Sequence, residues 1–289
     1  MNKNFLRKIW NSAFIRILVG FIAIMVLYTV FQLIIYAVEV PGIPTSLSGL
    51  VFAVIASIIG LIVYKIIYKA YERRKINELS SRNTGKYLFS GFLTGAILIS
   101  LSVLVVWLTG YYHVVKVNSL KAILPAITMA LISSVFEELA FRGVLFRITE
   151  SRLGSLWALA VSALFFGLAH IANPNSTLIA ALAIAVEAGI LLGVAYMWAR
   201  NLWFPIAIHF SWNLMQEGIF DINVSGNEAA NSILTSEISG PAWLTGSAFG
   251  IEASVQAVLF CLCVTTYLYI NCKKQNKIIP RHKKGSLKA

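Results

Sequence analysis

Long apolar runs separated by short polar segments extend along nearly the whole chain. A helix that spans a membrane needs about 20 mostly apolar residues. Eight stretches are of about that length: approximately 14–38, 47–68, 87–108, 122–148, 155–172, 177–198, 203–220 and 250–270. The pattern predicts an all-α, polytopic membrane helix bundle with about eight transmembrane helices.

The first apolar run follows three basic residues, Lys3, Arg7 and Lys8, which is also how a secretory signal peptide begins. The run is longer than the apolar core of a signal peptide, and no small-residue cleavage site follows it promptly. We therefore expect a membrane anchor that is retained.

Lysine and arginine are concentrated in a loop at 65–86 and a tail at 271–289, whereas the loop at 221–249 has acidic residues and neither Lys nor Arg. Basic segments favour the cytoplasmic side of a membrane. We therefore expect an N-in, C-in topology, with the two basic segments in the cytoplasm beside anionic lipid and the acidic loop outside. The whole chain, 1–289, is then a single membrane domain.

Composition supports the same interpretation. Of the 289 residues, 58% are hydrophobic and 12% are charged, whereas about 25% are charged in ordinary soluble domains. These values exclude a soluble globular enzyme and a disordered chain. The three cysteines form no CxxC motif and no disulfide framework. The net charge of +12 belongs to segments without interleaved aromatic residues, so we expect no nucleic-acid partner.

Two carboxylates and a guanidinium interrupt the fourth apolar stretch, at Glu137, Glu138 and Arg142. Burying such charges costs several kcal/mol unless they pair. Glu138 and Arg142 are four residues apart and share a helix face, so they form the predicted pair. Glu137 is rotated about 100° from Glu138, which makes it the freer carboxylate. The alternative interpretation is a packing network without chemistry.

Histidines interrupt two further apolar stretches. The chain has four histidines, of which His170 ends the fifth stretch and His209 lies in the seventh. Asn213 follows His209 by four residues, so both project from one helix face. A lone histidine in an apolar helix is usually a core residue, but two of them with an Asn and paired Glu residues favour a site.

These residue types support two kinds of hydrolysis. His170 and His209 could hold zinc while a carboxylate takes the proton of the bound water. A Glu–His pair can also polarise water without a metal, with an Asn donating to a developing oxyanion. The chain has no HExxH, GxSxG or SxxK motif, and no cysteine in these segments, so a covalent nucleophile is not expected.

The three motifs, in this order and at these separations, resemble those of the CPBP family. This family comprises CAAX prenyl endopeptidases of the Rce type and bacterial bacteriocin-processing or immunity proteins, also called Abi proteins. The resemblance covers a core at about 119–220. Its motifs are Glu137-Glu138-x-x-x-Arg142, Phe166-x-x-x-His170 and His209-x-x-x-Asn213.

The resemblance implies an intramembrane endopeptidase that acts on a membrane-associated peptide or lipopeptide, of the prenylated, bacteriocin or pheromone type. It implies that Glu137 is the general base on a water, helped by His170, and that His209 and Asn213 stabilise the oxyanion. Glu138 and Arg142 would support them. The family's customary name is metalloprotease, yet the residues fit zinc and metal-free chemistry equally.

Two points concern the geometry. Span counting places Glu137 and His209 near the bilayer midplane and His170 about 9 Å further out, at 1.5 Å per residue. We expect tilt, a shifted boundary or a kink near Pro125 or Pro205 to bring the three together. Glu187 is a third intramembrane acid outside the motifs, and it either lines the substrate cavity or accepts a hydrogen bond from a neighbouring helix.

Two other functions are compatible with intramembrane Glu and His. One is a proton-coupled transporter, although no inverted repeat is visible. The other is a non-catalytic bacteriocin-immunity protein with the same fold. Each function requires an integral multi-pass membrane protein, and in a bacterium we expect it in the plasma membrane.

Overall fold

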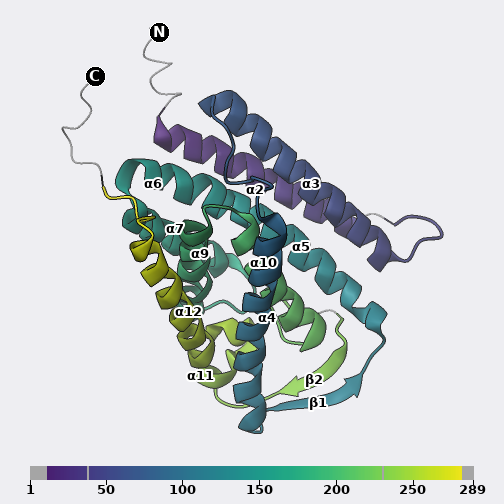
Figure 1. Ribbon diagram of the computed structural model, residues 1–289. Coiled ribbons are helices and arrows are strands. Elements are labelled where there is room, and N and C mark those ends of the chain that lie inside the picture. The colour runs from purple at the N-terminus through teal and green to yellow at the C-terminus, as the bar shows by residue number, and fades with distance from the viewer. Residues whose placement is uncertain (1–11, 38, 230, 282–289) are drawn as a thin grey trace, which may run out of the picture.

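Each of the eight predicted stretches is helical over most of its length in the computed structural model, which describes residues 12–37, 39–229 and 231–281 (Figure 1). Lys3, Arg7 and Lys8, and the part of the basic tail from residue 282 onward, lie outside the described residues. Seven helices within the described ranges are long and apolar enough to cross a membrane. The chain is thus a multi-pass, all-α membrane protein.

The elements have the following bounds. The amino-terminal half contains α2 (Ala13–Ala37), α3 (Thr45–Glu72), α4 (Thr84–Leu108), β1 (Tyr112–Val117), η1 (Leu120–Ile123), α5 (Leu124–Glu138), η2 (Leu139–Phe146) and α6 (Arg147–Leu153). The next part contains α7 (Ser155–Ala169), η3 (His170–Ala172), α8 (Leu178–Ile184), η4 (Ala185–Ile190), α9 (Leu191–Ala199), α10 (Trp203–Asn213) and η5 (Leu214–Ile219). The last part contains β2 (Leu234–Ile238), α11 (Ala242–Thr245), η6 (Ser247–Phe249), η7 (Ile251–Ala253) and α12 (Val255–Lys274).

The seventh predicted stretch, 203–220, differs from the others because it forms a shorter, more deeply buried helix. It consists of the eleven residues of α10 followed by the six residues of η5, and α10 packs against α4, α5 and α9. A helix in the interior of the bundle is surrounded by protein, so its length is not set by the thickness of the bilayer.

Close packing of α4 against α10 depends on Gly91 and Gly95 of α4. A Cβ atom at either position would collide with the backbone of α10, at Phe204 or at Ile208. Small residues let two helix backbones approach in this way. This contact fixes the position of α10 at Ile208, the residue directly before His209.

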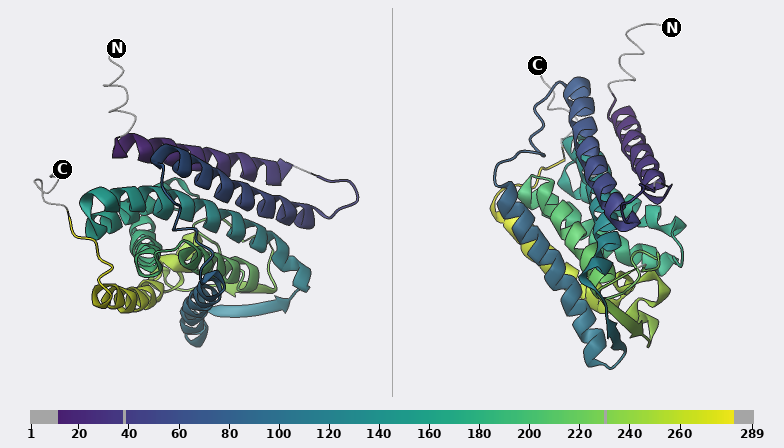
Figure 2. Two further views of the ribbon diagram at one scale, coloured as in Figure 1. Left: turned by 45° about the horizontal axis from the view of Figure 1, so that its top comes forward. Right: turned by 90° about the vertical axis from the view of Figure 1, so that its right-hand side faces the viewer.

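The antiparallel helices α2 and α3 lie side by side along one face of the molecule, as Figure 2 shows, and α3 packs on α5. The described apolar span of α2 is the least buried of the seven. This pair therefore forms one wall of the bundle, beside the helix that carries Glu137.

A two-stranded antiparallel sheet joins the α4–α5 connection to the acidic loop. Tyr112 pairs with Ile238 and Val117 with Leu234. The sequence analysis did not predict this sheet, because both strands are short segments in loops between apolar stretches. The sheet covers the end of the bundle that holds the acidic loop.

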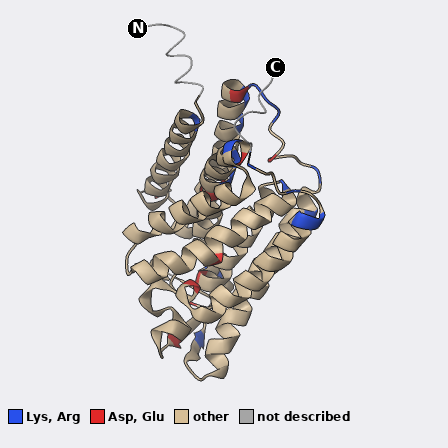
Figure 3. Ribbon diagram, turned by 90° about the vertical axis from the view of Figure 1, so that its left-hand side faces the viewer, with Lys and Arg blue, Asp and Glu red and all other residues tan. Residues whose placement is uncertain are grey.

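Basic side chains gather at the opposite end, where the described chain begins and ends (Figure 3). The predicted basic loop 65–86 is partly helical, since α3 extends to Glu72 and α4 begins at Thr84. Not all of this segment is exposed, since Glu78 is buried and paired with Arg74. The basic segments and the strand β2 of the acidic loop lie at opposite ends of the bundle (Figure 1 and Figure 3).

Candidate active site

Three of the candidate residues lie where regular helices change into π-helix. Glu137 and Glu138 are the last two residues of α5, directly before η2, and Asn213 is the last residue of α10, directly before η5. Glu187 lies inside η4. Short π-helical segments often occur at functional sites, because the extra residue in the turn redirects the side chains beside it.

The Glu138–Arg142 ion pair that the spacing predicts is present and fully buried. Arg142 Nη1 lies 2.6 Å from Glu138 Oε1, and both side chains have no exposed surface. Arg142 Nη2 also donates to the carbonyl oxygens of Ala188 and Gly189, at 3.1 Å each. The guanidinium lies over the Phe166 ring, 4.7 Å from its centroid. Arg142 therefore connects three helical segments around Glu138.

This pair holds His209 in one orientation. His209 Nδ1 lies 3.2 Å from Glu138 Oε1 and is placed to donate its proton there. The other ring nitrogen, Nε2, then faces Glu137, whose Oε2 is 4.0 Å away. The orientation of a histidine ring is set by the hydrogen bond of its second nitrogen. Glu138 thus directs His209 Nε2 toward Glu137.

Glu137 is the freer of the two adjacent carboxylates, as the helix geometry predicts. Its side chain is partly exposed, whereas that of Glu138 is not. Glu137 Oε2 is buried and has no hydrogen-bond partner among the described residues. A buried carboxylate oxygen without a donor is costly, so this oxygen requires an occupant that the protein alone does not provide.

His170 lies on the same cleft as Glu137 and His209. The three residues therefore converge, although span counting alone placed His170 further out. Its Nδ1 lies 2.7 Å from the carbonyl oxygen of Phe166, which leaves Nε2 available. The Phe166 ring contacts both imidazoles, with centroids 4.6 Å from His170 and 6.3 Å from His209. The predicted kink is not the reason, because Pro125 and Pro205 lie in the first turns of α5 and α10, where proline fits a helix.

A cleft of about 700 Å³ brings the motif residues to one surface. Its lining includes Glu137, His170, His209 and Asn213. Asn213 Nδ2 donates to Ser133 Oγ at 3.3 Å. The structure thus brings together all four residues to which the resemblance assigns chemistry, while Glu138 and Arg142 lie behind them.

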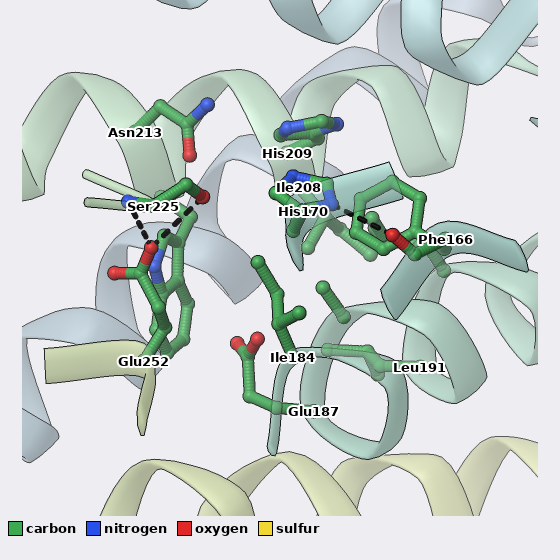
Figure 4. Close-up of a pocket in the computed structure, with 13 residues that line it drawn as sticks. Phe166, His170, Ile184, Glu187, Leu191, Ile208, His209, Asn213, Ser225 and Glu252 are labelled. Atoms are coloured by element: carbon green, nitrogen blue, oxygen red, sulfur yellow. Dashed lines mark hydrogen bonds between the residues drawn. The ribbon is translucent and has the colours of Figure 1, made fainter. Parts of the chain in front are cut away.

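A second, smaller cavity of about 30 Å³ adjoins the two histidines and has room for about one water molecule. Figure 4 shows His170 and His209 side by side on this pocket, with the carboxylate of Glu187 pointing into it. Glu187 also accepts a hydrogen bond from Cys261 Sγ at 3.5 Å. Glu187 thus accepts a hydrogen bond from a neighbouring helix, the second of the two predicted alternatives, and it lines the small cavity but not the large cleft.

Glu252 lines the same small cavity, and the sequence analysis missed it. The residue is buried directly before α12 and belongs to none of the three motifs. It accepts hydrogen bonds from Gln216 Nε2 and from the backbone and hydroxyl of Ser225. Burial raises the pKa of the Glu252 carboxyl, although these donors act in the opposite direction. No periodicity in the sequence indicates this burial.

The described side chains do not form a metal centre. No group of three His, Cys, Asp or Glu residues within the described ranges is arranged to hold a metal ion. His170 and His209 each use Nδ1 in a hydrogen bond within the protein, which leaves Nε2 of both rings available. Structural and catalytic zinc sites use at least three protein ligands. No step below passes through a metal.

The fold and these motif positions define a multi-pass membrane protein with a cleft in its helix bundle that carries Glu, His and Asn side chains. Residues 118–215, roughly a third of the chain, match the family described as type II CAAX prenyl endopeptidase Rce1-like. This match confirms the resemblance predicted from the motifs, and the family is one of CAAX-type membrane proteases. No curated protein and no solved structure matches the chain.

Proposed function

We propose that the protein is an intramembrane endopeptidase that hydrolyses a peptide bond in a membrane-associated peptide. One observation carries the proposal: the unpartnered Oε2 of Glu137 lies in a cleft that it shares with His170, His209 and Asn213. A water molecule placed against that oxygen would have a carboxylate to take its proton and imidazole nitrogens beside it. That combination is what general-base hydrolysis requires.

In the proposed reaction, Glu137 removes a proton from the water with help from His170 Nε2, and the water oxygen attacks the scissile carbonyl carbon. The resulting oxyanion accepts hydrogen bonds from His209 Nε2–H and from Asn213 Nδ2–H. Glu137 then passes its proton to the departing amine as the carbon–nitrogen bond breaks. The products are a carboxylic acid and an amine.

The proposed role of His209 requires a proton on both ring nitrogens, because Nδ1 donates to Glu138 and Nε2 must donate to the oxyanion. The ring lies between the two carboxylates, 3.2 Å from Glu138 and 4.0 Å from Glu137. Both ring nitrogens of a protonated histidine are donors, so Nε2 could then donate to an oxyanion.

The proposed substrate is a peptide or lipopeptide within or at the membrane. The alternatives are a prenylated peptide and a bacteriocin or pheromone precursor. In a bacterium the proposed location is the plasma membrane, with anionic lipid beside the basic segments. The alternative, a non-catalytic immunity protein with the same fold, would keep the cleft but its function would not depend on Glu137.

The test is cleavage of a membrane-peptide library by purified protein in lipid nanodiscs. Glu137→Gln keeps the shape of the side chain but cannot accept the proton, so we expect cleavage to fall by about 10²- to 10⁴-fold. Glu237→Gln is the matched control, because this exposed acid lies on β2 and does not line the cleft. Undiminished cleavage by Glu137→Gln would contradict the mechanism. Cleavage that is lost on chelation and restored by zinc would contradict the metal-free route.

A further inference from the structure

One wall of the cleft is formed by α2, and this wall carries a pair of polar side chains. Tyr28 and Gln32 both line the cleft and lie one helical turn apart on α2. Met25 and Ile35, on the same wall, are apolar. Polar side chains within a membrane helix usually face the bundle interior or a cavity and mark a functional position. The three sequence motifs lie on other helices and give this pair no role.

The two side chains are bonded to each other, and both keep hydrogen-bonding capacity. Gln32 Nε2 donates to the Tyr28 hydroxyl oxygen at 3.0 Å. Among the described residues, this is the only side-chain hydrogen bond that either of them makes. The hydroxyl can still donate its proton, and Gln32 can still accept a hydrogen bond at Oε1. The pair thus offers the cleft one donor and one acceptor, side by side.

Tyr28 lies beside Glu137. Its ring stacks on that of Phe136, the residue directly before Glu137, with ring centroids 5.6 Å apart and ring planes 22° apart. Tyr28 and Glu137 line the same cleft, close enough for the charge of the carboxylate to act on the hydroxyl. Gln32 is four residues further along α2, about 6 Å at 1.5 Å per residue. A substrate bond within reach of Glu137 therefore has this pair next to it.

The main chain of a membrane peptide needs such a pair where it is cut. Within a membrane, backbone N–H and C=O groups are satisfied inside a helix. A carbonyl carbon is open to attack only where the helix is unwound, and unwinding leaves an N–H and a C=O without partners. Leaving them unsatisfied in an apolar environment is costly. In an extended strand, one residue directs its N–H and its C=O toward the same neighbour, so a donor and an acceptor side by side can satisfy both.

We propose, on the basis of the endopeptidase function above, that Tyr28 and Gln32 bind the main chain of one substrate residue beside the scissile bond. The Tyr28 hydroxyl donates to the carbonyl oxygen of that residue, and Gln32 Oε1 accepts its N–H. The substrate then lies in extended form between α2 and the helices that carry the three motifs. Because these bonds involve only the main chain, they serve peptides of different sequence.

The experiment measures binding and turnover by the full-length protein in nanodiscs. Tyr28→Phe removes the hydroxyl and keeps the ring on Phe136, whereas Gln32→Met keeps a side chain of similar length without the amide. Each variant should raise Kd and KM by about fivefold, the size of one net hydrogen bond, and leave kcat nearly unchanged. Thr29→Val is the matched control, because Thr29 is exposed on the same helix, bonds to the carbonyl oxygen of Met25 and does not line the cleft. It should change none of the three constants.

A second measurement separates direct contact from a structural effect. The probe is the apolar peptide of the library that binds most tightly to the Glu137→Gln protein, labelled with fluorescein and followed by fluorescence anisotropy. Its backbone amides are replaced one at a time by esters, each of which lacks one N–H. At one position beside the scissile bond, the ester should weaken binding to the Glu137→Gln protein by about fivefold. The same ester should have no effect on the Glu137→Gln, Gln32→Met protein, whereas a purely structural role of Gln32 would leave the effect of the ester in place.

The outcomes separate this inference from the function on which it rests. If Tyr28→Phe and Gln32→Met weaken peptide binding but the wild-type protein cleaves no peptide, the endopeptidase is overturned and the main-chain site stands. If peptides are cleaved and both variants behave like Thr29→Val, the main-chain site is overturned and the endopeptidase stands. An ester scan that gives the same result with and without Gln32, or the failure of every library peptide to bind, also overturns the main-chain site.

Discussion

Two clusters of buried glutamate and arginine can be compared within this one molecule. At the basic end, Glu72 and Glu78 pair with Arg74 and Arg147, and all four carboxylate oxygens accept hydrogen bonds. In the middle of the bundle, Glu137 Oε2 and Glu138 Oε2 have no hydrogen-bond partner among the described residues.

This difference separates two uses of the same residue types. A carboxylate whose oxygens are all satisfied holds segments together, and it has no position left for a water or substrate. A carboxylate with an unpartnered oxygen facing a cleft contributes less to the stability of the fold, but that oxygen is available to a water or substrate. Between these two clusters, burial of charge does not identify the candidate site, whereas an unpartnered carboxylate oxygen on a residue that lines the cleft does.

Removal of the arginine should have the largest effect in the middle cluster. Arg142→Met leaves Glu138 as an uncompensated charge in a fully buried position, so we expect a loss of about 3–5 kcal/mol in unfolding free energy. Arg74→Met is the matched control: Arg74 is partly exposed, and Arg147 still pairs with Glu72 and Glu78, so the loss should be smaller, about 2 kcal/mol. Reversible unfolding in mixed micelles measures both. Equal losses would show that the two clusters do not differ in this way.

The basic-end cluster should make stability depend on pH. Burial alone would raise the pKa of Glu78, but hydrogen bonds from Arg74 and Tyr64 hold it below its ordinary value. A carboxyl whose pKa is lowered on folding stabilises the protein above its unfolded pKa, and this contribution is lost as the pH falls through the folded pKa.

The corresponding variant is Glu78→Gln. At pH 7 we expect it to be about 2 kcal/mol less stable than the wild type, the size of hydrogen bonds to a charged group. The difference should shrink as the pH falls below about 4, where the wild-type carboxyl becomes protonated. Unfolding curves at a series of pH values measure this trend, and a difference that is constant with pH would contradict it.

Replacement of Glu187 by glutamine should raise the unfolding free energy, whereas the same replacement at Glu78 should lower it. It is buried, and its hydrogen bond comes from Cys261, a weak thiol donor. A neutral amide costs less to bury than a carboxylate, so Glu187→Gln should raise the unfolding free energy by about 1 kcal/mol. A clear loss of stability would show that the carboxylate is satisfied by a partner, such as a water molecule in the small cavity.

The smallest change in stability is expected at Glu137. Because Oε2 has no hydrogen-bond partner, Glu137→Gln removes no bond at that atom, and unfolding should change by less than about 0.5 kcal/mol. The same variant should lose cleavage, as proposed above. A loss of activity that came with a loss of stability would place Glu137 with the structural glutamates.

Much of the fold could be predicted because its main signal is local. Apolar runs such as 87–108 coincide with helices to within a few residues, since membrane helices satisfy their own backbone hydrogen bonds. The Glu138–Arg142 pair was predictable for the same reason, because helix geometry alone brings residues four apart together.

The parts that could not be predicted depend on contacts between distant segments. The pairing of β1 with β2 joins residues more than one hundred positions apart, and no periodicity encodes which short strand finds which. The burial of Glu252 depends on Gln216 and Ser225, which belong to other segments. The convergence of His170 with Glu137 likewise depends on how α7 packs against η2, the segment that follows α5, and not on either sequence alone.

Gly91 and Gly95 have a consequence for protein engineering. Neither glycine lines the cleft, yet both determine how closely α4 approaches the helix of His209. A library that varies only the cleft residues to change specificity would retain this contact. A library that places even alanine at these two glycines would push the helix outward and inactivate the protein at a distance, without altering any residue that a substrate touches.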